Sequence, residues 1–143
     1  LSNSVHTVGD LGWTKGTGVP GARYGSGFSF GTRLFVSPYH PPTPGQRALN
    51  IDTGYTALEL GDLTLPLISE FKLTTANKFQ DLSAHRLVVT LNPRTGLLTG
   101  AVTPPGPPRI KFAGIVFQSE ELGVGHFLGP TRSGSVVIAG DTP

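Results

Sequence analysis

The stretch RLVVTLNPRTGLLTGAV, residues 86–102, decides the fold class of this 143-residue chain. Two β-prone segments, Arg86–Leu91 and Leu97–Val102, flank the pentapeptide Asn92–Gly96. Asn-Pro opens a type I turn, and the glycine at its end supplies the positive φ that closes such a turn. The stretch therefore predicts a β-hairpin that turns at Asn92–Gly96.

Segments with the same two-residue periodicity recur on both sides of this hairpin, separated by turns rich in the chain's 20 glycines and 13 prolines. Short alternating segments joined by such turns indicate an antiparallel meander. Within the first segment we expect a bulge at Gly31. We expect residues 1–26 to be an extended arm or an irregular lead-in, and residues 74–85 to be a connection that holds one helical turn. The expected strands are 28–36, 48–51, 55–60, 67–73, 86–91, 97–102, 109–118, 124–129 and 133–140.

Single glycines inside the expected strands favour one β architecture over the others. Gly100, Gly114 and Gly125 each interrupt an otherwise β-prone segment, and such glycines often mark sharp bends at barrel corners. We predict an all-β protein whose antiparallel meander of at least seven strands forms a closed or nearly closed β-barrel, with a two-sheet β-sandwich as the alternative. Residues 1–12 are expected to be an extended N-terminal arm or linker, and residues 13–143 a single β domain.

Composition excludes several classes of function. The chain has no cysteine, which excludes disulfides, thiolate zinc sites and cysteine nucleophiles. Its net charge is only +2 and its basic residues are scattered from Lys15 to Arg132, which argues against a nucleic-acid partner. No apolar run approaches the roughly 20 residues of a membrane helix, so we expect no membrane insertion. Because methionine is absent even at position 1, we interpret the chain as a processed product or a piece of a longer one.

Apparent enzyme motifs fail on their sequence context. Gly27–Gly31, GFSFG, matches G-x-S-x-G, but β-prone residues follow Ser29 where a nucleophile elbow needs a helix. Residues 16–21, GTGVPG, match a dinucleotide fingerprint, yet Pro20 opposes the helix that the fingerprint requires. We therefore expect no catalytic residue, no cofactor and no enzymatic activity.

Possible acid, base and metal ligands are equally unsupported. Asp81, Ser83 and His85 alternate, but neighbouring side chains on one strand diverge, so we interpret them as a solvated strand end. The four histidines show no metal-ligand spacing, and no calcium loop is present. We expect no metal site.

Exposed aromatic residues leave one binding function open. Trp13, Tyr24 and Tyr39 are candidate glycan-binding residues, because aromatic faces stack on sugar rings. In the alternative interpretation, Trp13 closes one end of the barrel and the tyrosines lie at the margin of the core with their hydroxyl groups bonded.

The expected N-terminal arm carries apolar residues at Leu1, Val5, Val8 and Leu11, with polar residues between them. An extended arm can pair with the exposed strand edge of a neighbouring copy, and repeated head-to-tail use of that contact builds a filament. The arm is equally compatible with a frayed linker, since chain termini are commonly disordered.

The chain also resembles a known module. The segments LNPRTGLLTGAV, RIKFAGIVFQ, GVGHFLG and SGSVVIA, together with Trp13 and Tyr39 in the first half, are similar to a β-rich module that recurs in very large secreted or surface proteins of Verrucomicrobia and related bacteria. The resemblance spans about Trp13 to Ala139, and the proline-rich turn PPGPP departs from it. It implies an extracellular or cell-surface location and a modular role, and it brings no active site with it.

These observations favour a non-catalytic extracellular structural module: a surface or filament-forming subunit, or a terminal module of a large surface protein, that binds copies of itself or other surface proteins. The alternative is a carbohydrate-binding module whose partner is a polysaccharide. A small-ligand carrier that uses the barrel lumen is a more distant alternative, because the apolar residues suffice to fill the interior.

Overall fold

The computed structural model describes residues 7–18, 20–21, 24–84, 86–106 and 108–141. They form ten antiparallel β-strands and one short 3-10 helix, which confirms the predicted all-β fold. No helix among these residues is long and apolar enough to cross a membrane. The elements are β1 (Thr7–Lys15), β2 (Phe28–Val36), β3 (Thr53–Leu60), β4 (Leu67–Leu73), β5 (Phe79–Asp81), β6 (Arg86–Leu91), β7 (Leu97–Thr103), β8 (Ile110–Phe117), η1 (Gln118–Glu120), β9 (Leu122–Leu128) and β10 (Ser133–Gly140).

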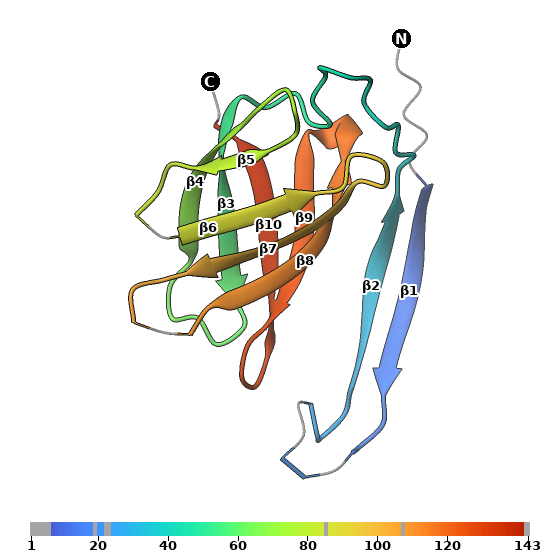
Figure 1. Ribbon diagram of the computed structural model, residues 1–143. Helices are drawn as coiled ribbons and strands as arrows, with labels where there is room; N and C mark the ends of the chain where they lie inside the picture. The colour runs from blue at the N-terminus through green and yellow to red at the C-terminus, as the bar shows by residue number, and fades with distance from the viewer. Residues whose placement is uncertain (1–6, 19, 22–23, 85, 107, 142–143) are drawn as a thin grey trace.

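Eight of the strands form one sheet that curls into a nearly closed barrel (Figure 1). The strand order is β5-β4-β3-β10-β9-β8-β7-β6. Its two edge strands meet at a seam, where a bridge joins Lys78 to Thr90 and the amide of Leu87 donates a 2.9 Å hydrogen bond to the carboxylate of Asp81. The barrel that we expected first, rather than the sandwich, is therefore the observed architecture.

The hairpin of β6 and β7 turns where the sequence predicts. The carbonyl oxygen of Asn92 accepts hydrogen bonds from the amides of Thr95 (3.2 Å) and Gly96 (2.9 Å), and the Asn92 side chain accepts one from the amide of Arg94 (3.0 Å). Gly96 has φ +71°, the left-handed value that the turn requires.

Alternate residues of the barrel strands point inward and fill the interior. In β6 the buried residues are Leu87, Val89 and Leu91, and Leu58 of β3 and Phe71 of β4 are fully buried. This alternation of buried and exposed positions is the expected pattern for a sheet with one face on the core and one face in water.

Two segments differ from the predicted pattern. Residues 48–51 are not a strand, although Leu49 is buried in the core. Side chains satisfy the backbone there: the amide of Ala48 donates to the Asn77 carboxamide (2.7 Å), and its carbonyl accepts from Gln118 (3.2 Å). The connection 74–85, where we expected one helical turn, instead contains β5.

The largest difference from the predicted pattern lies near the N-terminus, because residues 7–15 are not irregular. They form β1, which pairs with β2 in an unbroken register from Thr7 opposite Val36 to Lys15 opposite Phe28. Gly31 lies directly opposite Gly12, so the bulge that we expected at Gly31 is absent. Strand β1 thus runs across residue 12, where we placed the end of the arm, and forms a two-stranded sheet with β2.

The β1–β2 hairpin stands beside the barrel as a separate two-stranded sheet (Figure 1). At one end, the hydroxyl groups of Ser37 and Ser119 are hydrogen-bonded at 3.2 Å. At the other end, the amide of Ser133 donates a 2.6 Å hydrogen bond to the hydroxyl of Tyr24. Among the described residues, β1 and β2 make extensive contacts only with each other.

Candidate functional site

The register of the β1–β2 hairpin sorts its side chains onto two faces, since residues directly opposite each other in an antiparallel pair share a face. Trp13 lies opposite Phe30, and Leu11 lies opposite Thr32. These residues and their neighbours two positions away share one side of the hairpin. The apolar residues of this side form what we call the hairpin apolar face: Leu11, Trp13, Phe28, Phe30, Leu34 and Val36. Thr32 lies among them, and Lys15 lies on the same side at the tip of the hairpin.

An aromatic cluster orders the middle of this face. The ring of Trp13 stacks on that of Phe30 with centroids 6.2 Å apart and an interplanar angle of 28°, and it meets Phe28 edge-on at 6.2 Å. Tyr24 continues the cluster at the tip, 5.5 Å from Phe28. Aromatic pairs in such geometries stabilise each other by about 0.5–1.5 kcal/mol beyond the area they bury.

The face is nevertheless open to solvent. Trp13 is 57% exposed, and Phe30 and Leu34 are 48% and 49% exposed. A Cβ built on Gly9, which shares this face, or on Gly12, on the other face, would meet no atom within 4 Å. Because an isolated two-stranded hairpin is only marginally stable in water, this exposed face is a candidate for contact with a partner.

The opposite face of the hairpin is more polar. Asp10 and Arg33 lie opposite each other, and the hydroxyl groups of Thr14 and Ser29 are hydrogen-bonded at 3.0 Å. Ser29 therefore lies within a continuous strand and bonds a threonine across it. This is not the strand–turn–helix setting of a nucleophile elbow.

The three candidate glycan-binding residues do not form one platform. Tyr24 precedes β2 and Tyr39 follows it, and a nine-residue strand spans about 30 Å. The Tyr39 hydroxyl donates a 2.9 Å hydrogen bond to the carbonyl of Pro93, and partial burial raises the pKa of Tyr39. Trp13 does not close the barrel, because it lies on the hairpin apolar face. It is the most exposed of the three candidate glycan-binding residues.

The four residues that we expected to form an assembly arm are Leu1, Val5, Val8 and Leu11, and the two that the structure describes do not share a face. Leu1 and Val5 lie outside the described residues. Val8 lies opposite Phe35, on the face that does not contain Leu11. Sequence reasoning missed Phe30, Leu34 and Val36 as functional candidates, because alternating apolar residues in a strand ordinarily point into a core. One signal in the sequence could have pointed to these three residues. The strand β1 contains glycines, so it offers few side chains that could cover its partner strand.

Other candidate chemistry remains dispersed. The carboxylate of Asp81 accepts hydrogen bonds from the amide (3.0 Å) and hydroxyl (2.7 Å) of Ser83, which is a local turn arrangement, and His85 lies outside the described residues. In the part of the chain that the structure describes, no group of three or more His, Asp or Glu residues is placed to hold a metal ion.

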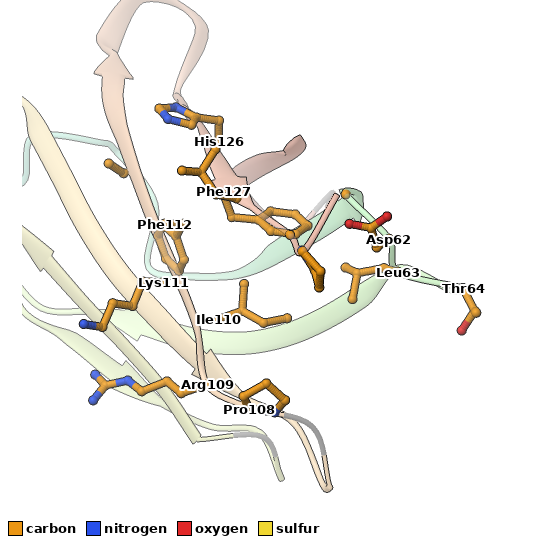
Figure 2. A pocket seen from close by; sticks show the side chains of 15 residues that line it. Asp62, Leu63, Thr64, Pro108, Arg109, Ile110, Lys111, Phe112, His126 and Phe127 are labelled. Carbon is orange, nitrogen blue, oxygen red and sulfur yellow. The ribbon is translucent and has the colours of Figure 1, made fainter. Parts of the chain in front are cut away.

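An open groove of about 860 Å³ lies at one end of the barrel, between the β3–β4 turn and the neighbouring ends of β8 and β9 (Figure 2). The side chains of Leu63, Ile110 and Phe127 gather on its apolar side, whereas the charged ends of Arg109 and Lys111 point away from them (Figure 2). The pairing of β8 with β9 ends at Phe112 opposite Phe127. Beyond this pair the two strands separate, which opens the groove.

Asp62 fixes one rim of this groove. Its carboxylate accepts hydrogen bonds from the hydroxyl and amide of Thr131 (2.5 and 2.8 Å) and from the amide of Arg132 (3.0 Å). The hydrogen bond from the Thr131 side chain, followed by those from the two amides, lowers the pKa of Asp62. The carboxylate thus ties the β3–β4 turn to the β9–β10 loop.

We expect Asp62→Ala to lower the thermal midpoint at pH 7. Because the pKa of Asp62 is lowered on folding, its contribution is present above the unfolded pKa of about 3.9 and is lost as pH falls through the lower folded pKa. The difference from the native protein should therefore shrink in melts recorded below about pH 4. Glu70→Ala is the control, since no described group donates a hydrogen bond to the Glu70 side chain; an Asp62→Ala difference that is unchanged at low pH would contradict the prediction.

No family model, curated protein or solved structure matches this chain. By its geometry it belongs to the class of small all-β barrels, with an appended hairpin that exposes an apolar face. What the protein does must be inferred from the hairpin and the barrel themselves.

Proposed function

We propose that this protein is a non-catalytic structural module that self-associates through the hairpin apolar face. The observation that carries the proposal is the ordered but uncovered face of a two-stranded sheet, in which Trp13, Phe30 and Leu34 are each about half exposed. Exposed apolar patches on soluble proteins commonly mark interaction sites. A partner that covers this face supplies the second layer that an isolated hairpin lacks.

An extracellular or cell-surface setting completes the proposal. It is supported by the resemblance of Trp13–Ala139 to modules of large secreted bacterial proteins, and the cysteine-free sequence is compatible with it. The non-catalytic role is supported by the dispersal of acids, bases and hydroxyl groups described above.

We expect Leu34→Asp to weaken self-association strongly, because a carboxylate buried in an apolar contact without a partner is costly. Sedimentation equilibrium or light scattering over a range of protein concentrations measures the change. The adjacent residue offers a matched control: Phe35 is 54% exposed, compared with 49% for Leu34, but lies on the other face. Phe35→Asp should therefore leave association near that of the native protein. A native protein that stays monomeric at high concentration would refute the proposed function.

A carbohydrate-binding function is the second candidate, favoured by the exposed ring of Trp13. The hydroxyl of Tyr24 already accepts a hydrogen bond from Ser133, and Lys15 lies over its ring with its amine 6.0 Å from the centroid. Trp13 is thus the residue with which a sugar would stack. Glycan-array binding by the native monomer, lost in Trp13→Ala, would favour this candidate over self-association.

A further inference from the structure

The outer surface of the barrel carries an apolar row that runs across the strands. In this row, outward-pointing residues of adjacent strands lie directly opposite each other. Ile68 lies opposite Ala57, Ala57 opposite Val137, and Val137 opposite Val124. The row continues from Val124 through Ile115 to Leu97. The six positions of this row, one in each of six neighbouring strands, are thus all apolar on the solvent side, where polar residues are usual.

A second apolar row lies beside the first over four of these strands. It consists of Tyr55, Ala139, Leu122 and Phe117, again directly opposite one another. The next row on the other side is mostly polar and includes Glu59, Ser135 and His126. The two apolar rows therefore form a bounded patch on the outer face of β3, β10, β9 and β8. We call this patch, together with Ile68 of β4 and Leu97 of β7 at the ends of the first row, the barrel apolar belt.

The belt is exposed at Ile68, Leu97 and Ile115, whereas its two alanines, Ala57 and Ala139, are buried. Ile68, Leu97 and Ile115 are 54%, 52% and 43% exposed. The chain's own hairpin leaves these three residues exposed, and its own apolar residues Trp13, Phe30 and Leu34 are also about half exposed. The hydrogen bonds of Ser37 and Tyr24 to the barrel fix the two ends of the hairpin.

We propose that the barrel apolar belt of one copy receives the hairpin apolar face of a second copy. This inference rests on the proposed function and names the surface that self-association uses. Each copy carries both surfaces, each surface has exposed apolar side chains, and neither presents a charged side chain at its centre. A lone charge at the centre of either surface would be costly to bury, so their uncharged centres suit the two surfaces to each other.

The two surfaces also match in size. Four strands spaced about 4.8 Å apart make the two-row part of the belt about 14 Å wide, and the six-strand row is about 24 Å long. The hairpin apolar face from Phe28 to Val36 is about 26 Å long. With aromatic side chains of about 150–250 Å² each, half-exposed Trp13 and Phe30 and their aliphatic neighbours offer roughly 400 Å². This area is at the lower end for specific interfaces, so we expect weak association, in the micromolar range or above.

The contact joins two different surfaces and is therefore heterologous. A heterologous contact forms a ring if the rotation between copies closes and a filament if it does not. In either assembly each internal copy uses its hairpin once and its belt once.

Cysteine pairs test this contact directly, since the native chain contains no cysteine. Leu34→Cys and Ile115→Cys are prepared as separate proteins, mixed and mildly oxidised, and we expect a disulfide-linked heterodimer between them. Val88→Cys replaces Ile115→Cys in the control mixture: Val88 is 44% exposed, compared with 43% for Ile115, but it points outward from β6, beyond the belt. The control mixture should give at least about tenfold less heterodimer.

The outcomes separate the two proposals. Ile115→Asp should weaken association at least about tenfold, as Leu34→Asp does, while Val88→Asp should not. If Leu34→Asp abolishes association but Ile115→Asp does not, the receiving surface lies elsewhere and only this inference is overturned. A double Leu34→Cys/Ile115→Cys chain that closes its disulfide internally, without a dimer, would also overturn it. Absence of association in the native protein would refute the proposed function itself.

Discussion

Phe127→Ala should destabilise the barrel by about 3–5 kcal/mol, the range measured when a large buried aromatic side chain is removed. The side chain of Phe127 in β9 is 2% exposed and belongs to the central core cluster. Its ring is so close to two glycines that a Cβ on Gly61 or Gly134 would lie 2.6 or 2.2 Å from ring atoms. Truncation therefore leaves a cavity whose backbone walls cannot readily close it.

Urea denaturation measures this loss as a lower midpoint with an unchanged slope. The next residue provides the control, because Leu128 is 56% exposed and points the other way. Leu128→Ala should change the free energy of unfolding by no more than about 0.5 kcal/mol. Equal effects of the two substitutions would mean that the buried and exposed sides of β9 are assigned wrongly.

The strands of the barrel were largely predictable because their signal is local. Alternation fixes which residues of 86–91 and 133–140 point inward, and the turn at Asn92–Gly96 is encoded by three residue types in sequence. Residues 48–51 misled the same reasoning. This segment has the apolar composition of a strand, but it pairs with no strand among the described residues. Its backbone is hydrogen-bonded instead to the side chains of Asn77 and Gln118, which are distant in sequence.

The candidate site could not be predicted in the same way. Alternation in β2 shows that Phe28, Phe30, Leu34 and Val36 share a face, but it does not show what covers that face. Two-residue periodicity ordinarily means burial within the same chain, whereas Phe30, Leu34 and Val36 are exposed and Phe28 is half-buried. The barrel apolar belt was hidden for a related reason: its rows cross six strands, and only the register of the sheet brings their members together.

The belt exists because neighbouring strands pair in a particular register, and this pairing requires the strands to lie close together. Between β8 and β9, a pair of opposite glycines permits the close approach. Gly114 of β8 and Gly125 of β9 lie directly opposite each other, pointing inward. A Cβ on Gly114 would lie 2.3 Å from the carbonyl oxygen of Val124 and 2.9 Å from the Cα of Gly125. These are backbone atoms, which cannot move aside without separating the two strands.

Gly114→Ala should therefore destabilise the protein by about 3 kcal/mol or more, at the upper end of the cost of overpacking a well-packed interior. Gly31→Ala is the matched control: Gly31 also lies inside a strand, but its Cβ would meet no atom within 4 Å. Alanine there should be neutral or slightly stabilising, because glycine loses more chain entropy on folding. Urea midpoints of the two variants, compared with that of the native protein, measure both effects. Because the β8–β9 register aligns Ile115 with Val124, any folded Gly114→Ala protein should also self-associate more weakly than Gly31→Ala. A Gly114→Ala protein as stable as the native one would contradict the close approach of β8 and β9.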